Sequence, residues 1–154
     1  MIIKIKPLLI NICIPLVVGG LGGFISSGSM DAFKMMNKPP LSPPGWLFPV
    51  VWTILYIMMG VAAYLVRDTY AKRDNAMRLY VVQLIFNFFW TLIFFNLGAY
   101  LFALIWLLVL WGLILATFIS FKNIRPAAGY LLIPYLCWVT FAAYLNLGVF
   151  IMNK

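Results

Sequence analysis

The chain has 154 residues, of which 66% are hydrophobic and only 9% are charged, and its formal net charge is +8. This composition excludes an ordinary soluble domain, in which about a quarter of the residues are charged. The chain has no histidine and only three acidic residues, which argues against a metal site and against conventional acid–base catalysis.

The charged residues are confined to short patches that leave uncharged windows at 7–30, 39–66, 79–121 and 126–153. A bilayer core takes about 20 helical residues, so the first, second and fourth windows hold one span each. The third window is longer and breaks at the stretch from Asn96 to Tyr100, where Asn and Gly favour a turn, so it holds two spans in a tight hairpin. The sequence therefore predicts an all-α fold, an integral membrane bundle of five transmembrane helices in a single domain over residues 1–154.

In chain order we expect helices at about 7–25, 44–66, 79–95, 100–121 and 126–151, with a loop at about 26–43 after the first. The first helix contains four glycines, of which Gly19 and Gly23 form a small-xxx-small pair that lets helices approach closely. Packing inside the bundle is the favoured interpretation of this pair, and the seam of a homodimer is the alternative.

The segment from Lys38 to Tyr56 reads KPPLSPPGWLFPVVWTILY. Proline fixes φ and has no N–H, so its four leading prolines favour a stiff extended loop, and Pro44 also suits the first turn of a helix. A rigid loop that leads into an apolar helix indicates a lid over a membrane cavity. The lid residues are Lys38, Pro39, Pro43 and Pro44.

Three expected helices carry polar or aromatic stripes. In the third, Gln83, Asn87 and Trp90 share one face by their spacing. Amides inside a membrane need partners, so this face either forms interhelical hydrogen bonds or lines a cavity, and both interpretations stay open.

The fifth helix has a similar stripe made of Tyr135, Trp138, Ala142 and Asn146, and the second helix offers Trp52 and Tyr56. A large ring above a small residue leaves a slot beside it. Stripes of this kind on three helices suit a flat, mostly apolar ligand.

Orientation follows from the distribution of Lys and Arg. One side carries Lys4, Lys6, Arg67, Lys72, Arg73, Arg78, Lys122 and Arg125, and the other carries Lys34, Lys38 and Lys154. The excess places the amino terminus in the cytoplasm, with the lid and the carboxy terminus outside, in a bacterial cytoplasmic membrane. It also explains most of the net charge, so we expect membrane lipids with anionic head groups as partners and no nucleic acid.

Ionisable and nucleophilic groups are scarce in the expected spans. The carboxylates Asp31, Asp68 and Asp74 lie in expected loops, so a proton-coupled pump has no candidate residue. Cys13 and Cys137 are not part of a CxxC pair and are interpreted as ordinary buried thiols.

The Lys38–Tyr56 segment resembles the signature of the tryptophan-rich sensory proteins, also called translocator proteins or peripheral benzodiazepine receptors. That signature is approximately KPxWxPPxWxxxPVWxxLY, and a second family pattern is PYLxWxxFAxxLN. The matching residues are Lys38, Pro39, Pro43, Pro44, Trp46, Trp52, Leu55 and Tyr56, then Pro134, Tyr135, Leu136, Trp138, Phe141, Ala142, Leu145 and Asn146. Leu41 departs from the pattern, because the family usually has Trp there.

The resemblance implies a five-helix bundle, often a homodimer, whose cavity is closed by the loop after the first helix. It implies protoporphyrin or a related tetrapyrrole as ligand, with no permanent cofactor, together with isoquinoline and benzodiazepine compounds. The carboxy-terminal cholesterol motif of animal members is missing. With the stripes, the resemblance gives the candidate binding residues Trp46, Trp52, Tyr56, Gln83, Asn87, Trp90, Tyr135, Trp138, Ala142, Leu145 and Asn146.

The resemblance leaves three functions open. The chain acts as a sensor or scavenger of porphyrin, as a light-dependent degrader of protoporphyrin, or as a transporter of porphyrin or other small lipophilic molecules. Degradation would involve Trp52 and Trp138 without a conventional catalytic site. Transport lacks an ion-coupling residue in the spans.

Overall fold

The computed structural model describes residues 2–67 and 73–153, and within them it is helical without strands. The helices are α1 (Ile5–Lys34), α2 (Leu47–Arg67), α3 (Arg73–Thr91), the π-helical η1 (Leu92–Asn96), α4 (Tyr100–Ile124), α5 (Pro126–Tyr130) and α6 (Ile133–Met152). Five segments are long and apolar enough to cross a membrane: Ile5–Ser29, Leu47–Arg67, Arg73–Asn96, Tyr100–Ile124 and Pro126–Met152. The predicted all-α membrane bundle is confirmed. Asp68, Lys72 and Lys154 of the charge pattern lie outside the described residues.

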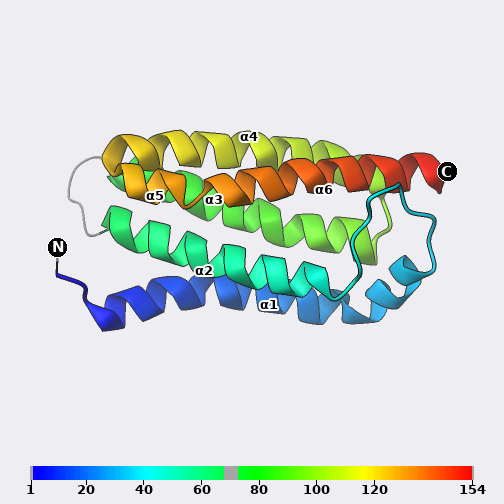
Figure 1. The fold of residues 1–154 in the computed structure, drawn as a ribbon, viewed down its shortest axis with the longest axis horizontal. Helices are drawn as coiled ribbons and strands as arrows, with labels where there is room; N and C mark the ends of the chain where they lie inside the picture. The colour runs from blue at the N-terminus through cyan, green and yellow to red at the C-terminus, as the bar shows by residue number, and fades with distance from the viewer. Residues whose placement is uncertain (1, 68–72, 154) are drawn as a thin grey trace.

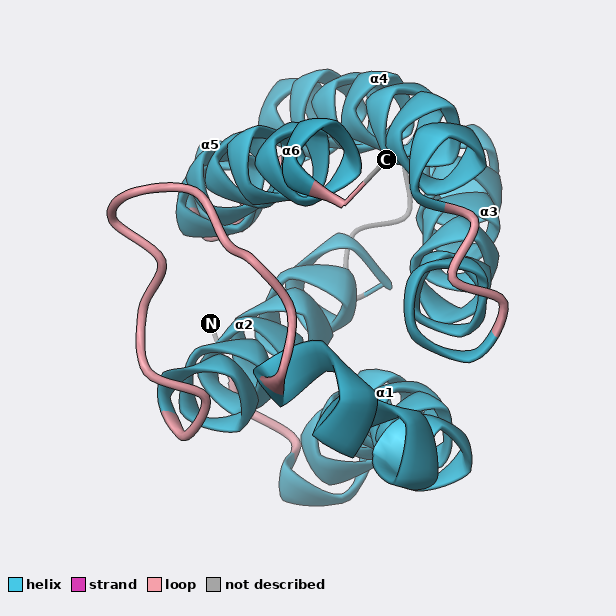
Figure 2. Ribbon diagram, turned by 90° about the vertical axis from the view of Figure 1, so that its right-hand side faces the viewer, coloured by secondary structure: helices cyan, strands magenta, loops and turns pink. Residues whose placement is uncertain are grey.

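The helices run side by side along one axis, with the amino terminus at one end and the carboxy terminus at the other (Figure 1). Helix α2 packs along α1, whereas α4 packs against both α3 and α6. Seen along the axis, the α1–α2 pair lies opposite the group formed by α3, α4 and α6 (Figure 2). The backbones of α2 and α6 rarely come close, so side chains span the distance between them.

Close packing of α1 on α2 depends on a proline and a glycine. Pro15, inside α1, has no N–H to give to the Asn11 carbonyl. Gly60 of α2 lies against that carbonyl, and a Cβ atom on it would be 2.7 Å from the Asn11 oxygen and 2.4 Å from the Ile12 Cα. The missing side chain of Gly60 therefore lets the two backbones touch where Pro15 leaves the Asn11 carbonyl without its helical N–H donor.

Helix α1 is longer than predicted, because it continues to Lys34 instead of ending at residue 25. Its last turns are held by Phe33, whose ring lies 5.6 Å from Phe94 and 5.4 Å from Phe95, both edge to face. At 30 residues α1 is about 45 Å long, so its end projects beyond a hydrocarbon core of about 30 Å. The connecting loop is correspondingly shorter than the predicted 26–43 and covers 35–46, which we call the 35–46 loop.

Two further boundaries differ for local reasons. Helix α2 begins at Leu47 and not at Pro44, because the Leu47 N–H donates to the Pro44 carbonyl in a turn that precedes the helix. Helix α3 begins at Arg73, before the predicted residue 79, with Asp74 in its first turn, where the helix dipole favours a negative charge.

The last span is divided into α5 and α6 by a turn at Leu131 and Leu132. Pro134 explains the break, because it offers no N–H to the Tyr130 carbonyl and its ring would clash with that carbonyl in a continuous helix. The prediction of one helix over 126–151 was therefore wrong at this point. The predicted hairpin near Asn96 is confirmed, with Gly98 in the left-handed region at φ 60°.

Candidate ligand-binding site

The polar side chains of three helices meet at Asn87. The Tyr56 hydroxyl of α2 donates to Asn87 Oδ1 at 3.0 Å, and Asn87 Nδ2 donates to the Tyr135 hydroxyl of α6 at 2.8 Å. That hydroxyl in turn donates to Gln83 Oε1 at 2.7 Å. All four residues are buried. We call them the amide network, and they tie α2, α3 and α6 together where the backbones of α2 and α6 lie apart.

A second polar contact lies farther along α3. Trp90 Nε1 donates to Asn146 Oδ1 at 3.2 Å, and Asn146 Nδ2 donates to the Tyr100 carbonyl at 2.9 Å. The stripe predicted on α3 therefore makes interhelical hydrogen bonds at each of its three residues. Its other proposed role, cavity lining, stays a prediction.

Aromatic rings fill the space between α2 and α6 beside the amide network. Trp52 stacks on Tyr56 with ring centroids 5.5 Å apart. It meets Tyr135 and Trp138 edge to face, with ring centroids 6.2 and 6.4 Å away. We call these four residues the aromatic cluster. Such pairs favour offset or edge-to-face geometry, so the cluster offers ring faces and edges to a flat ligand that displaces one of its members.

Tyr56 occupies its position because Gly19 of α1 has no side chain. A Cβ atom at Gly19 would lie 2.1 Å from the Tyr56 ring. Gly23, its predicted partner in the small-xxx-small pair, has nothing within 4 Å of such an atom. Internal packing is thus confirmed for Gly19 but not for Gly23.

A groove of about 420 Å³ lies on the outer side of the aromatic cluster, between α2 and α6. We call it the lateral groove. It is lined by Val51, Ile54, Leu55, Met58, Pro134, Cys137, Trp138 and Phe141. Trp138 belongs both to this groove and to the aromatic cluster, so its ring separates the two.

Two buried donors at the site have no hydrogen-bond partner among the described residues. They are Gln83 Nε2, at one end of the amide network, and Trp138 Nε1, on a residue that also lines the lateral groove. An unmet buried donor costs about 1–3 kcal/mol. Asn87 already uses both of its polar atoms, so these two groups are the donors most available to a ligand.

The 35–46 loop is fastened to α6. Asn37 and Asn153 exchange hydrogen bonds, with Asn153 Nδ2 donating to the Asn37 carbonyl at 2.8 Å and the Asn37 N–H donating to Asn153 Oδ1 at 3.3 Å. The Tyr144 hydroxyl donates to the Pro40 carbonyl at 2.7 Å. Pro39 is buried against Gly148, where a Cβ atom would lie 2.4 Å from the proline ring. Tyr144, Gly148 and Asn153 are residues that the sequence analysis missed.

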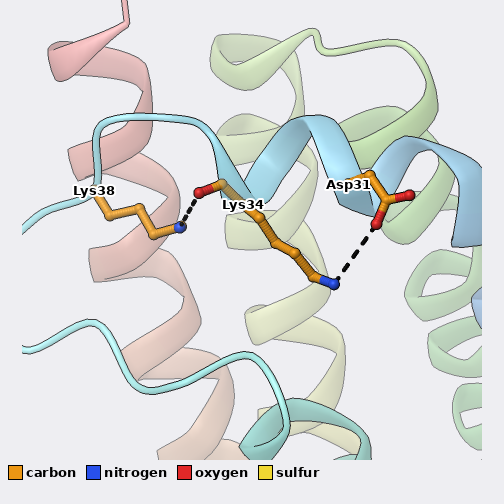
Figure 3. A network of polar contacts seen from close by, with 3 residues as sticks. All are labelled: Asp31, Lys34 and Lys38. Carbon is orange, nitrogen blue, oxygen red and sulfur yellow. Dashed lines mark hydrogen bonds and ion pairs between the residues drawn. The ribbon is translucent and has the colours of Figure 1, made fainter.

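Lys38 lies at the start of this loop and completes the end of α1. Its ammonium donates to the Lys34 carbonyl at 3.2 Å, and Lys34 pairs with Asp31 at 3.6 Å (Figure 3). The same ammonium lies 5.0 Å from the centre of the Phe33 ring. A cation at the carboxy end of a helix interacts favourably with its dipole. Lys38 therefore has a structural role in the described state.

The remaining candidates divide by position. Ala142 and Leu145 are buried in α6. Pro43 is half-buried and Pro44 is exposed. Trp46 is 66% exposed and contributes to neither the aromatic cluster nor the amide network. The structure thus brings together Trp52, Tyr56, Gln83, Asn87, Tyr135 and Trp138 and leaves Trp46 outside. No group of three His, Cys, Asp or Glu residues gathers within 2–67 and 73–153.

Comparisons with protein-family models and with known proteins point to the same family. A model of the TspO/MBR family matches residues 11–152. The chain is 39% identical over 150 residues to the tryptophan-rich protein TspO of Chlorobaculum tepidum, covering 95% of this chain and 94% of the relative. It is 38% identical over 121 residues to the tryptophan-rich sensory protein of Cereibacter sphaeroides, covering 79% and 76%. It is also 33% identical over 147 residues to the translocator protein of Sus scrofa, covering 90% and 87%.

Proposed function

The chain belongs to the TspO/MBR family, and we propose that this membrane protein binds a flat, largely apolar tetrapyrrole such as protoporphyrin at the aromatic cluster. The observation that carries the proposal is the group of four rings between two helices whose backbones stay apart. A planar ligand can replace ring–ring contacts with contacts to its own π surface at little loss. Isoquinoline and benzodiazepine compounds meet the same requirement.

The available donors support a ligand that carries hydrogen-bond acceptors. Trp138 Nε1 and Gln83 Nε2 are unpartnered among the described residues, whereas Asn87 is held by Tyr56 and Tyr135. A ligand oxygen or nitrogen that reaches either donor would satisfy a buried group. In this proposal Asn87 positions the two tyrosines and does not itself provide the main contact to the ligand.

The chain contains no histidine, the usual axial ligand of haem iron. We therefore expect protoporphyrin without metal to bind more tightly than haem. Matched titrations in one detergent test this, and equal affinities would contradict it.

Fluorescence-quench titration with protoporphyrin in the dark tests the binding site. Trp52→Leu removes a central ring of the cluster, and we expect it to weaken binding about tenfold or more, as loss of a buried aromatic anchor does. The matched control is Trp46→Leu, which removes an exposed ring outside the cluster and should leave affinity unchanged. Equal loss in both variants, or none in Trp52→Leu, would reject this site.

Light-dependent degradation of the bound porphyrin is a second candidate function. It is favoured by one observation, the 6.4 Å separation of the Trp52 and Trp138 rings, which puts two oxidisable side chains where the ligand would lie. An indole would donate one electron to the excited porphyrin, and the porphyrin radical anion would pass that electron to dioxygen, the oxidant, to give superoxide. The indole radical cation would then take one electron back from the porphyrin, and superoxide would add to the resulting porphyrin radical cation, forming the first C–O bond of ring oxidation. The Trp52→Phe and Trp138→Phe variants should then bleach bound protoporphyrin more slowly under light, and bleaching at the wild-type rate would exclude this role.

A further inference from the structure

A ligand could reach the aromatic cluster by two routes, past the 35–46 loop at the end of the bundle or through the lateral groove, and the first is more firmly closed. At the end of the bundle, the 35–46 loop is held on α6 by the Asn37–Asn153 pair, the Tyr144–Pro40 hydrogen bond and the packing of Pro39 on Gly148. A ligand that came from water at this end would have to release all three contacts.

The route through the side of the bundle, between α2 and α6, is less obstructed. The lateral groove lies between α2 and α6, whose backbones rarely approach each other there, and its lining is made of apolar side chains and the Cys137 thiol. A hydrocarbon environment is continuous with such a surface. Only side chains, and no backbone contact comparable to that between α1 and α2, separate the groove from the cluster.

Trp138 is the side chain at this boundary. Its ring lines the lateral groove and also packs against two other rings, with centroid distances of 6.4 Å to Trp52 and 5.7 Å to Phe48. Its Nε1 atom is buried without a partner in the described part of the chain. A ligand acceptor that reached this N–H would gain a hydrogen bond without breaking one, which favours movement of the ring toward an incoming ligand.

We propose that the lateral groove is the entrance site of the protein, where a membrane-dissolved, flat, apolar molecule with a hydrogen-bond acceptor binds first. This inference rests on the proposed function and adds the route. The ligand arrives from the bilayer between α2 and α6, and rotation of the Trp138 ring brings its buried indole N–H to the ligand acceptor and admits the ligand to the aromatic cluster. The 35–46 loop remains on α6 throughout.

The two native cysteines allow a test on the folded protein. Both cysteines are exposed, so their interpretation as buried thiols was wrong: Cys137 lines the lateral groove, and Cys13 lies on the outer face of α1. The Cys13→Ser protein is alkylated at Cys137 with N-ethylmaleimide in lipid nanodiscs, and the association rate of protoporphyrin is followed by fluorescence quenching in the dark. The Cys137→Ser protein alkylated at Cys13 is the matched control.

Alkylation of Cys137 fills part of the groove, so protoporphyrin should associate about tenfold or more slowly with that protein. Its association with the protein alkylated at Cys13 should stay unchanged.

A second measurement closes the route past the 35–46 loop. Asn37→Cys and Asn153→Cys, placed together in a Cys13→Ser/Cys137→Ser background, replace the hydrogen-bonded pair that joins the loop to the end of α6 and are oxidised to a disulfide. The oxidised protein should associate with ligand within about a factor of two of the reduced one.

The possible outcomes separate the two proposals. Normal equilibrium binding with an unchanged rate after Cys137 alkylation would show that the groove holds only lipid chains, and would overturn the entrance but not the binding function. Block of association by the loop disulfide would place the route at the end of the bundle and would also overturn it. Lack of any protoporphyrin binding by the unmodified protein would overturn the function and the entrance together.

Discussion

At the scale of single residues, Gly19 determines where the Tyr56 ring lies. The Gly19→Ala variant would put a methyl group 2.1 Å from that ring, so Tyr56 must move and release Asn87. We expect Gly19→Ala to destabilise the fold by about 1–3 kcal/mol. Reversible unfolding in mixed micelles measures this. Gly20→Ala is the control, because nothing lies within 4 Å of the added atom, and equal stability of the two variants would contradict the packing.

A second prediction at the scale of single residues concerns Asn87. Interhelical hydrogen bonds in membranes are worth about 0.6 kcal/mol on average, so Asn87→Leu, which removes two, should cost about 1–2 kcal/mol. A double-mutant cycle with Tyr56→Phe isolates the Tyr56–Asn87 bond by the same unfolding assay. Strict additivity of the two single changes would show that this bond contributes nothing.

Helical spacing correctly placed Gln83, Asn87 and Trp90 on one inward face, because a buried amide stripe has few other positions. It could not assign their partners. Asn87 pairs with two tyrosines and Trp90 with Asn146, and these choices depend on how far α6 is shifted along α3. The exclusion of Trp46 also depends on tertiary structure, since its sequence context matches the family signature.

At the scale of elements, four uncharged windows and the turn expected between Asn96 and Tyr100 were sufficient to predict five spans, because the cost of charge in hydrocarbon fixes where helices cross. Their ends depend on contacts that sequence does not show. Helix α1 continues to Lys34 because Phe33 meets Phe94 and Phe95, which lie more than sixty residues later. The break before α6 was foreseeable from Pro134, since proline in a helix interior is costly.

The attachment of the 35–46 loop to α6 gives a third prediction. Gly148→Ala would place a methyl group 2.4 Å from the Pro39 ring and should lift the loop from α6. We expect faster hydrogen exchange at the loop amides, measured by mass spectrometry. Gly112→Ala, which has open space around the added atom, should leave the exchange unchanged, and equal protection in both variants would refute the attachment.

At the scale of the whole molecule, five spans put the two termini at opposite ends, as the structure has them (Figure 1). The excess of Lys and Arg predicts that the amino-terminal end faces the cytoplasm. Single cysteines test this in intact cells after Cys13 and Cys137 are replaced by Ser. We expect a membrane-impermeant maleimide to label Leu41→Cys in the 35–46 loop, and Asn123→Cys at the opposite end only after the cells are permeabilised. The reverse pattern would invert the orientation.

The central claim is that the aromatic cluster binds a tetrapyrrole, and indole NMR tests it most directly. The chain has six tryptophans, so the ¹⁵N-labelled protein gives six resolvable indole N–H signals during a titration with protoporphyrin in the dark. A stacked porphyrin ring should shift the Trp52 and Trp138 signals strongly, while Trp46 and Trp111 stay in place. Saturable binding that leaves the Trp52 and Trp138 signals unchanged would contradict the account.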